Sequence, residues 1–151
     1  AETYLLVGDA LGRAMIDLHL GQTGNPDYQI WNASYPNVNL SDPDDDYDGD
    51  GLTNREEWIW GLDPTSKKSM NPIAVVRNVS TGELTYTRRD DALTGLAYEV
   101  WVSSDLVSWT KDENATQSTS VPDGSGVEMV TVNVSNSLFS NERLFVRIQA
   151  Q

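Results

Sequence analysis

The pattern of apolar and polar positions divides the chain into three stretches. From residue 67 onward apolar residues alternate with polar ones, and turn residues interrupt them at STGE, ALTG, SSDL and PDGSG. This pattern is typical of short strands. It predicts strands at residues 73–79, 83–89, 97–103, 108–112, 127–134 and 143–150. Because no helical stretch separates them, we expect a mainly β protein in which residues 67–151 form an antiparallel β-sandwich.

Residues 41–66 combine a run of aspartates with a short amphipathic pattern. Four apolar residues recur at helical spacing there: Leu52, Trp58, Ile59 and Leu62. Gly61 is placed to end a helix, and Pro64 prevents its continuation. We therefore expect an acidic loop followed at once by a short helix.

Residues 1–40 form the third stretch. Leu11, Met15 and Leu18 recur at helical spacing between a possible N-cap, Asp9, and Gly21, which predicts one helix. The following NPDYQIWNASYPNVNL contains two prolines and is expected to be turn-rich. The expected organisation is thus an N-terminal segment with one helix (1–40), an acidic loop–helix (41–66) and a β-sandwich module (67–151).

Charge and composition limit the partners of the chain. Its formal net charge is -13, so nucleic acid and anionic membrane surfaces are not expected to bind, whereas a cation is. Thiolate sites and multi-histidine zinc sites are excluded because there is no cysteine and only one histidine. No stretch approaches the ~20 apolar residues of a membrane span, so no membrane insertion is expected.

The aspartate run matches a twelve-position calcium loop. Asp46, Asp48 and Asp50 occupy positions 1, 3 and 5, and Gly51 occupies position 6, where the chain turns sharply. Later positions supply the carbonyl of Leu52, the side chain of Asn54 and, on the first helical turn, the carboxylate of Glu57. Alternate residues of such a loop direct oxygen atoms to one centre, which predicts Ca²⁺ and makes Mg²⁺ the weaker candidate.

The remaining acidic residues leave alternatives open. Asp42, Asp44 and Asp45 could complete the ligand shell or hold a second ion, and Asp63 is the preferred additional ligand. Asp63 could equally begin the DPTS turn. The run as a whole could be a solvated acidic linker, but the spacing, the glycine and the trailing glutamate together favour a metal site. Thr53 stands where paired loops carry a hydrophobic residue, so a lone loop–helix is expected.

The motif DYDGDGLTNREEWIWGLDP resembles bacterial thrombospondin type 3 and dockerin-like calcium repeats, with their D-x-D-G-D-G-L-x-N-x-x-E core and G-x-D-P continuation. Residues 84–110 and 144–151 resemble a β module that follows such repeats in large secreted proteins of planctomycete and verrucomicrobial type. The resemblance covers residues 40–151. It implies calcium-ligand roles for Asp46, Asp48, Asp50, Leu52 and Glu57, and neighbouring carbohydrate-active or adhesive domains. TSKKSM replaces the second aspartate repeat that such arrays supply.

No catalytic set is recognisable. YLLVGDALG has Ala10 where a serine esterase opening of the GDS type has its nucleophile, His19 lacks a matching acidic partner motif, and no glycine-rich phosphate loop is present. The expected function is that of a non-catalytic calcium-binding accessory module of a secreted or cell-surface protein, targeting a polysaccharide. An adhesion or spacer domain with structural calcium is the alternative, and a hydrolase fragment is less favoured.

Exposed aromatics are the expected sugar-binding residues. In AYEVWVS the alternation that buries Tyr98, Val100 and Val102 turns Trp101 and Glu99 outward. Trp60, Tyr47 and Trp31 are further candidates, with Arg89 and Asp91 as partners for hydroxyl groups. The alternative is that these aromatics fill the core, as Trp58 and Trp109 are expected to do.

Overall fold

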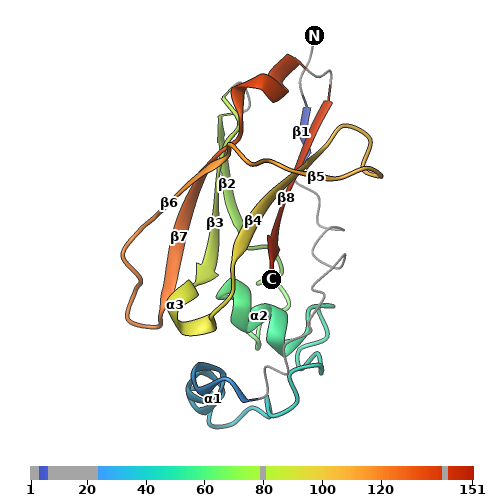
Figure 1. Ribbon diagram of the computed structural model, residues 1–151. Helices are drawn as coiled ribbons and strands as arrows, with labels where there is room; N and C mark the ends of the chain where they lie inside the picture. The colour runs from blue at the N-terminus through green and yellow to red at the C-terminus, as the bar shows by residue number, and fades with distance from the viewer. Residues whose placement is uncertain (1–3, 7–23, 79–80, 141–142) are drawn as a thin grey trace.

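A computed structural model describes residues 4–6, 24–78, 81–140 and 143–151, and all of their side chains except those of residues 4–6, 74–78 and 139–140. These residues form two four-stranded sheets (Figure 1). The first sheet has the order β1 (Tyr4–Leu6), β8 (Arg143–Ala150), β4 (Tyr98–Ser103) and β5 (Thr110–Lys111). The second sheet has the order β2 (Ile73–Asn78), β3 (Glu83–Arg89), β7 (Val127–Asn133) and β6 (Thr116–Thr119). Every pairing is antiparallel except the parallel pairing of β1 with β8.

The expected mainly-β architecture and all six expected strands are present, although β5 is shortened to two residues. The pattern missed β6, which pairs with β7 along the edge of the second sheet. All four of its residues, Thr116–Thr119, are exposed, so it carries no apolar alternation. β1 was also missed, since its three residues are too few to show a period.

The expectation of a turn-rich segment after residue 24 was wrong, because α1 spans Pro26–Ala33. Asn25 is its N-cap, and the side-chain oxygen of Asn25 accepts a hydrogen bond from the backbone of Asp27 at 2.8 Å. Pro26 occupies the first turn, where its missing N–H costs nothing. The Asn-Pro pair is therefore a helix start signal here. The helix expected around Leu11–Leu18, and His19 with it, lies outside the described residues.

The helix expected after the aspartate run is confirmed as α2, Asn54–Trp60. Thr53 and Glu56 form a capping box at its start. Gly61 ends it in the left-handed conformation, with φ 65°. A Cβ on Gly61 would lie 2.7 Å from Cγ1 of Val127 at the start of β7. The position thus needs glycine for its backbone and for its packing. Two shorter helices complete the description, α3 (Asp91–Thr94) and η3 (Asn136–Ser140).

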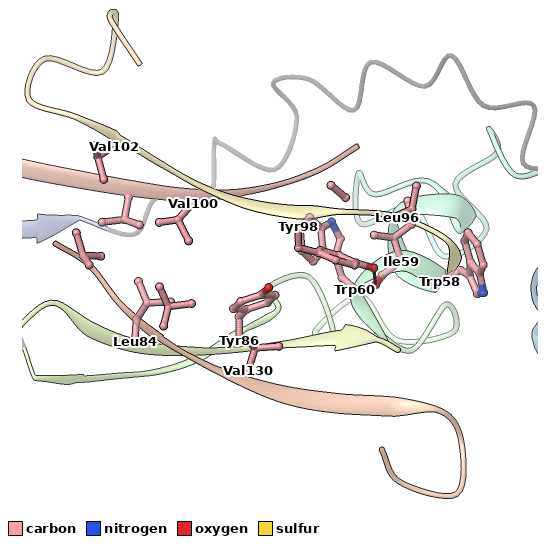
Figure 2. Packing of buried hydrophobic residues seen from close by; sticks show 14 of the residues in the cluster. Trp58, Ile59, Trp60, Leu84, Tyr86, Leu96, Tyr98, Val100, Val102 and Val130 are labelled. Carbon is pink, nitrogen blue, oxygen red and sulfur yellow. Dashed lines mark hydrogen bonds between the residues drawn. The ribbon is translucent and has the colours of Figure 1, made fainter. Parts of the chain in front are cut away.

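One hydrophobic cluster joins the two sheets and α2. Figure 2 shows Val100 and Val102 of β4 facing Leu84 and Val130 of the second sheet, with Trp60 and Ile59 at one end. The Trp60 ring lies 6.1 Å from that of Tyr86 and 5.7 Å from that of Tyr98, both edge-to-face. The helix that follows the aspartate loop therefore contacts both sheets through one tryptophan.

A buried ion pair connects α1 to the second sheet. Asp27 accepts two hydrogen bonds from the guanidinium of Arg89 at the end of β3. Nε donates one and Nη2 donates the other, the latter at 2.9 Å. Nε1 of Trp58 in α2 donates a third at 2.9 Å. α1, α2 and β3 thus meet at one carboxylate, at the end of the molecule where all three α-helices lie (Figure 1). No helix within the described ranges is long and apolar enough to cross a membrane.

Candidate metal site in the aspartate loop

Asp46 closes the loop on itself through two backbone hydrogen bonds. Its Oδ1 accepts from the N–H of Gly49 at 2.7 Å, and its Oδ2 accepts from the N–H of Gly51 at 2.9 Å. Both glycines have positive φ, 75° and 99°, a conformation that other residues reach only with strain. The two glycines of DGDG therefore let the chain curl around the Asp46 carboxylate.

Asp48 and Asp50 repeat this arrangement on a smaller scale. Oδ1 of Asp48 accepts from the N–H of Asp50 at 3.0 Å, and Oδ1 of Asp50 accepts from the N–H of Leu52 at 2.7 Å. Their Oδ2 atoms are buried and receive no hydrogen bond from any described residue. One carboxylate oxygen from each of Asp46, Asp48 and Asp50 lies within 4.8 Å of the others. The loop thus groups the three aspartates that the spacing predicted.

Glu57 is the least compensated acidic residue of this region. It is only 1% exposed, and neither of its carboxylate oxygens has a hydrogen-bond partner among the described residues. The pKa of Glu57 is raised to about 8, chiefly by burial and then by the charges of Asp48, Asp50, Asp46 and Asp63. A buried carboxyl beside other carboxylates and without a donor is costly unless a proton or a cation neutralises it.

The donor set fits a hard cation. Every orphaned atom of Asp48, Asp50 and Glu57 is a carboxylate oxygen, which is the ligand type that Ca²⁺ prefers. Bound Ca²⁺ would hold the Glu57 carboxyl in its charged form and offset the repulsion among the aspartates. The N–H of Leu52 positions Asp50; the role expected for the Leu52 carbonyl stays a prediction.

Asn54, a predicted metal ligand, also forms hydrogen bonds with the aspartate run. Its side-chain Nδ2 donates to the carbonyl of Asp42 at 2.7 Å, and its backbone N–H donates to the carbonyl of Asp45 at 2.8 Å. Asn54 therefore fastens the aspartate run to the start of α2. Its Oδ1 is buried and has no partner in the described part of the chain, and its proposed role as a ligand stays a prediction.

Two of the additional ligands expected from the sequence have other partners. Asp44 is not one of the three grouped aspartates; its side chain is 77% exposed and pairs with Nη2 of Arg55 at 2.8 Å. Its proposed role as a ligand stays a prediction. Asp63 accepts hydrogen bonds from the N–H and Oγ1 of Thr65 at 3.0 and 2.7 Å, as the turn alternative predicts. Its charge nevertheless contributes to the raised pKa of Glu57, so Asp63 borders the site.

The residues expected to bind a sugar differ in how exposed they are. Trp60 and Trp31 are 7% and 6% exposed and belong to the core, so the expectation of sugar stacking on their faces was wrong. Arg89 is buried on Asp27 and cannot reach a ligand. Tyr47 is 44% exposed on the aspartate loop and keeps the accessibility expected of it.

Trp101 and Glu99 lie on the first sheet, on the face opposite the core, and both are partly exposed. Nε1 of Trp101 donates to Oε2 of Glu99 at 3.2 Å, and Oε1 of Glu99 pairs with Lys111 at 2.8 Å. Glu99 also accepts from Gln151 at 3.0 Å. The Glu99 carboxylate is therefore engaged by protein donors, which leaves Trp101 as the stronger of the two candidates.

Sequence reasoning missed Arg147 and placed Trp109 in the core. The guanidinium carbon of Arg147 lies 4.4 Å from the ring centroid of Trp109 and 5.5 Å from that of Trp101. The alternation in RLFVRIQA places Arg147 opposite the buried Val146. Only the register of β4 with β8, which pairs Trp101 with Arg147, identifies its neighbours.

Comparison with protein-family models, with curated proteins and with solved structures finds no match to this chain. The kinship suggested by the calcium motif therefore rests on the motif residues themselves.

Proposed function

We propose that this chain is a non-catalytic, calcium-binding accessory module of a secreted or cell-surface protein, in which the two sheets act as a β-sandwich and an EF-hand-like loop–helix holds Ca²⁺. Asp46, Asp48, Asp50 and Glu57 are the proposed carboxylate ligands, with the carbonyl of Leu52 as a further one. The observation that carries the proposal is Glu57, a buried carboxyl that has no donor among the described residues and whose pKa is raised by burial and by the charges of the three grouped aspartates.

Calcium at this site would stabilise the fold through α2. Glu57 belongs to the same seven-residue helix as Trp58, Ile59 and Trp60, which are buried against the sheets and α1. Extracellular modules bind Ca²⁺ with dissociation constants of about 10⁻⁴–10⁻³ M. A tenfold excess over such a constant stabilises the folded state by about 1.4 kcal/mol. Relief of repulsion among the carboxylates is part of that binding free energy.

The test compares two neighbouring glutamates of α2. Glu57→Gln removes the proposed ligand, whereas Glu56→Gln removes an equal charge from the capping box, a role that glutamine also fills. Calorimetric titration should show calcium binding by the wild type and the Glu56→Gln variant, and a loss of at least about tenfold in affinity for Glu57→Gln. The melting temperature of the wild type should rise with calcium and fall with chelator. A melting temperature indifferent to chelator, with no metal found by elemental analysis, would disprove the proposal.

Polysaccharide targeting is the second candidate function, and the partly exposed Trp101 favours it. An indole face offers flat apolar area for a sugar ring. The alternative is a spacer or adhesion domain in which calcium is only structural. Retention of the full chain on a polysaccharide gel, weakened in a Trp101→Ala variant, separates targeting from the spacer role.

A further inference from the structure

Arg147 is the unusual cation of the first sheet. It is half-buried on β8, and its guanidinium lies over Trp109 at 4.4 Å and beside Trp101 at 5.5 Å. Its Nε is buried without a hydrogen-bond partner, and no described residue forms an ion pair with it. Burial alone lowers the pKa of Arg147, with no carboxylate to counter it.

Other partly or fully buried arginines of the described chain are paired with acids. Arg88 pairs with Glu128 at 2.6 Å, Arg89 with Asp27, and Arg55 with Asp44. A chain with 23 acidic and 10 basic residues has acids in excess. Arg147 is partly desolvated in such a chain, lacks a counter-ion among the described residues and leaves its buried Nε without an acceptor.

Glu99, an acidic residue on the same face of the sheet, does not fill that role. Glu99 is held by Lys111 at 2.8 Å, by Nε1 of Trp101 at 3.2 Å and by Gln151 at 3.0 Å. The cross-strand neighbours of Trp101 are Lys111 on β5 and Arg147 on β8, both cations. Lys111 is itself paired with Glu99 and Glu113. Of these two cations, Arg147 is therefore the one without an acidic partner among the described residues, and the rings of Trp101 and Trp109 border it.

We propose that Arg147, Trp101 and Trp109 form a binding site for an anionic sugar, in which the guanidinium pairs with a carboxylate or sulfate group and the indoles contact the apolar face of the ring. The arginine fork matches both anions in a bidentate geometry. This inference deepens the polysaccharide candidate above and does not depend on the calcium site, since none of its residues belongs to the aspartate loop or α2.

The experiment uses the full chain in calcium and one polymer backbone in three forms: dextran, carboxymethyl dextran and dextran sulfate. Affinity electrophoresis should retain the wild type on at least one charged form and not on neutral dextran; the retaining form identifies carboxylate or sulfate as the recognised group. Arg147→Gln should weaken retention at least about tenfold, the loss expected for a charge-assisted pair. Arg143→Gln, which removes an equal charge from an exposed position of the same strand, should leave retention unchanged.

Several results would overturn the proposal. The first is that neither charged dextran retains the wild type, and the second is that Arg147→Gln is retained as strongly as the wild type. The third is that Arg143→Gln weakens retention as much as Arg147→Gln does. The fourth is that polyglutamate, which carries carboxylates without sugar rings, retains the wild type as strongly as a charged dextran does. Each variant is first checked for a calcium-dependent rise in melting temperature. If Arg147→Gln does not fold, Trp109→Ala and Arg147→Lys take its place, with weakened retention expected in both. Because Glu57→Gln tests calcium separately, failure of one proposal leaves the other standing.

Discussion

Asp27 and Glu57 are both buried acidic residues next to Trp58, but their surroundings differ. Asp27 accepts a hydrogen bond from the Trp58 indole, and Glu57 precedes Trp58 in α2. Asp27 receives a bidentate pair from Arg89 and a hydrogen bond from Trp58. Glu57, although more buried, receives no hydrogen bond from the described residues, and the charges of Asp48, Asp50 and Asp46 act on it. A buried carboxylate with donors joins elements of the fold, whereas one without donors requires a proton or a cation to neutralise it.

The two pKa shifts express this difference. Burial raises the pKa of Asp27, but the hydrogen bonds from Arg89 and Trp58 outweigh it, and the pKa falls below its ordinary value. For Glu57, burial and the neighbouring charges act in the same direction and raise the pKa to about 8. The stability that Asp27 contributes is therefore lost in acid, whereas the stability of the calcium-free fold should decline as Glu57 ionises.

The largest expected effect is this pH dependence without calcium. The folded-state pKa of Glu57 is raised from 4.5 to about 8. The stability that the protonated Glu57 carboxyl contributes is therefore fully present below pH 4.5 and is lost as the pH rises toward 8. The free energy of unfolding should fall across that window by a few kcal/mol, up to about 5. Urea denaturation in chelator at pH 5 and pH 8 measures it. The slope should flatten in Glu57→Gln and with saturating calcium; a slope unchanged in that variant would assign the effect to other groups.

Asp27→Asn removes the charge of the buried acid that has donors. It leaves Arg89 buried with an amide in place of its counter-ion, so we expect a loss of about 3–5 kcal/mol in the free energy of unfolding. The loss should be equal with and without calcium, because Asp27 does not touch the aspartate loop. Glu113→Gln, at an exposed position with one long ion pair of 3.6 Å, is the matched control with no expected change. A calcium-dependent loss in Asp27→Asn would mean that the two regions are coupled.

The smallest expected effect concerns the end of the helix that carries Glu57. Gly61→Ala combines a positive φ with a Cβ 2.7 Å from Val127 and should destabilise by about 2–3 kcal/mol. Gly95→Ala has a similar φ, 73°, but an open surrounding, so about 1 kcal/mol is expected. Chemical denaturation measures both. The difference between them isolates the packing of α2 on β7, and equal losses would show that this contact contributes little.

The metal loop could be read from the sequence because its determinants are local. The spacing of the aspartates, two glycines with positive φ and a glutamate on the first helical turn all lie within twelve residues. The hydrogen bonds from backbone N–H groups to the carboxylates of Asp46, Asp48 and Asp50 join residues at most five apart. The strands were predictable for a similar reason wherever one face is buried. β6 was not predicted because both of its faces are exposed. α1 was not predicted because its start signal, Asn25-Pro26, was taken for a turn.

What the sequence alone determined about this protein is the periodic strands, the caps of α2, and the acidic loop that leads into it. The tertiary structure decided which charged groups have partners. Asp27 meets Arg89 across 62 residues, and Arg147 meets Trp101 only through the register of β4 and β8. Whether a buried charge stabilises the fold or awaits a ligand depends on side chains that long-range packing brings within a few ångströms, and no local pattern specifies that distance.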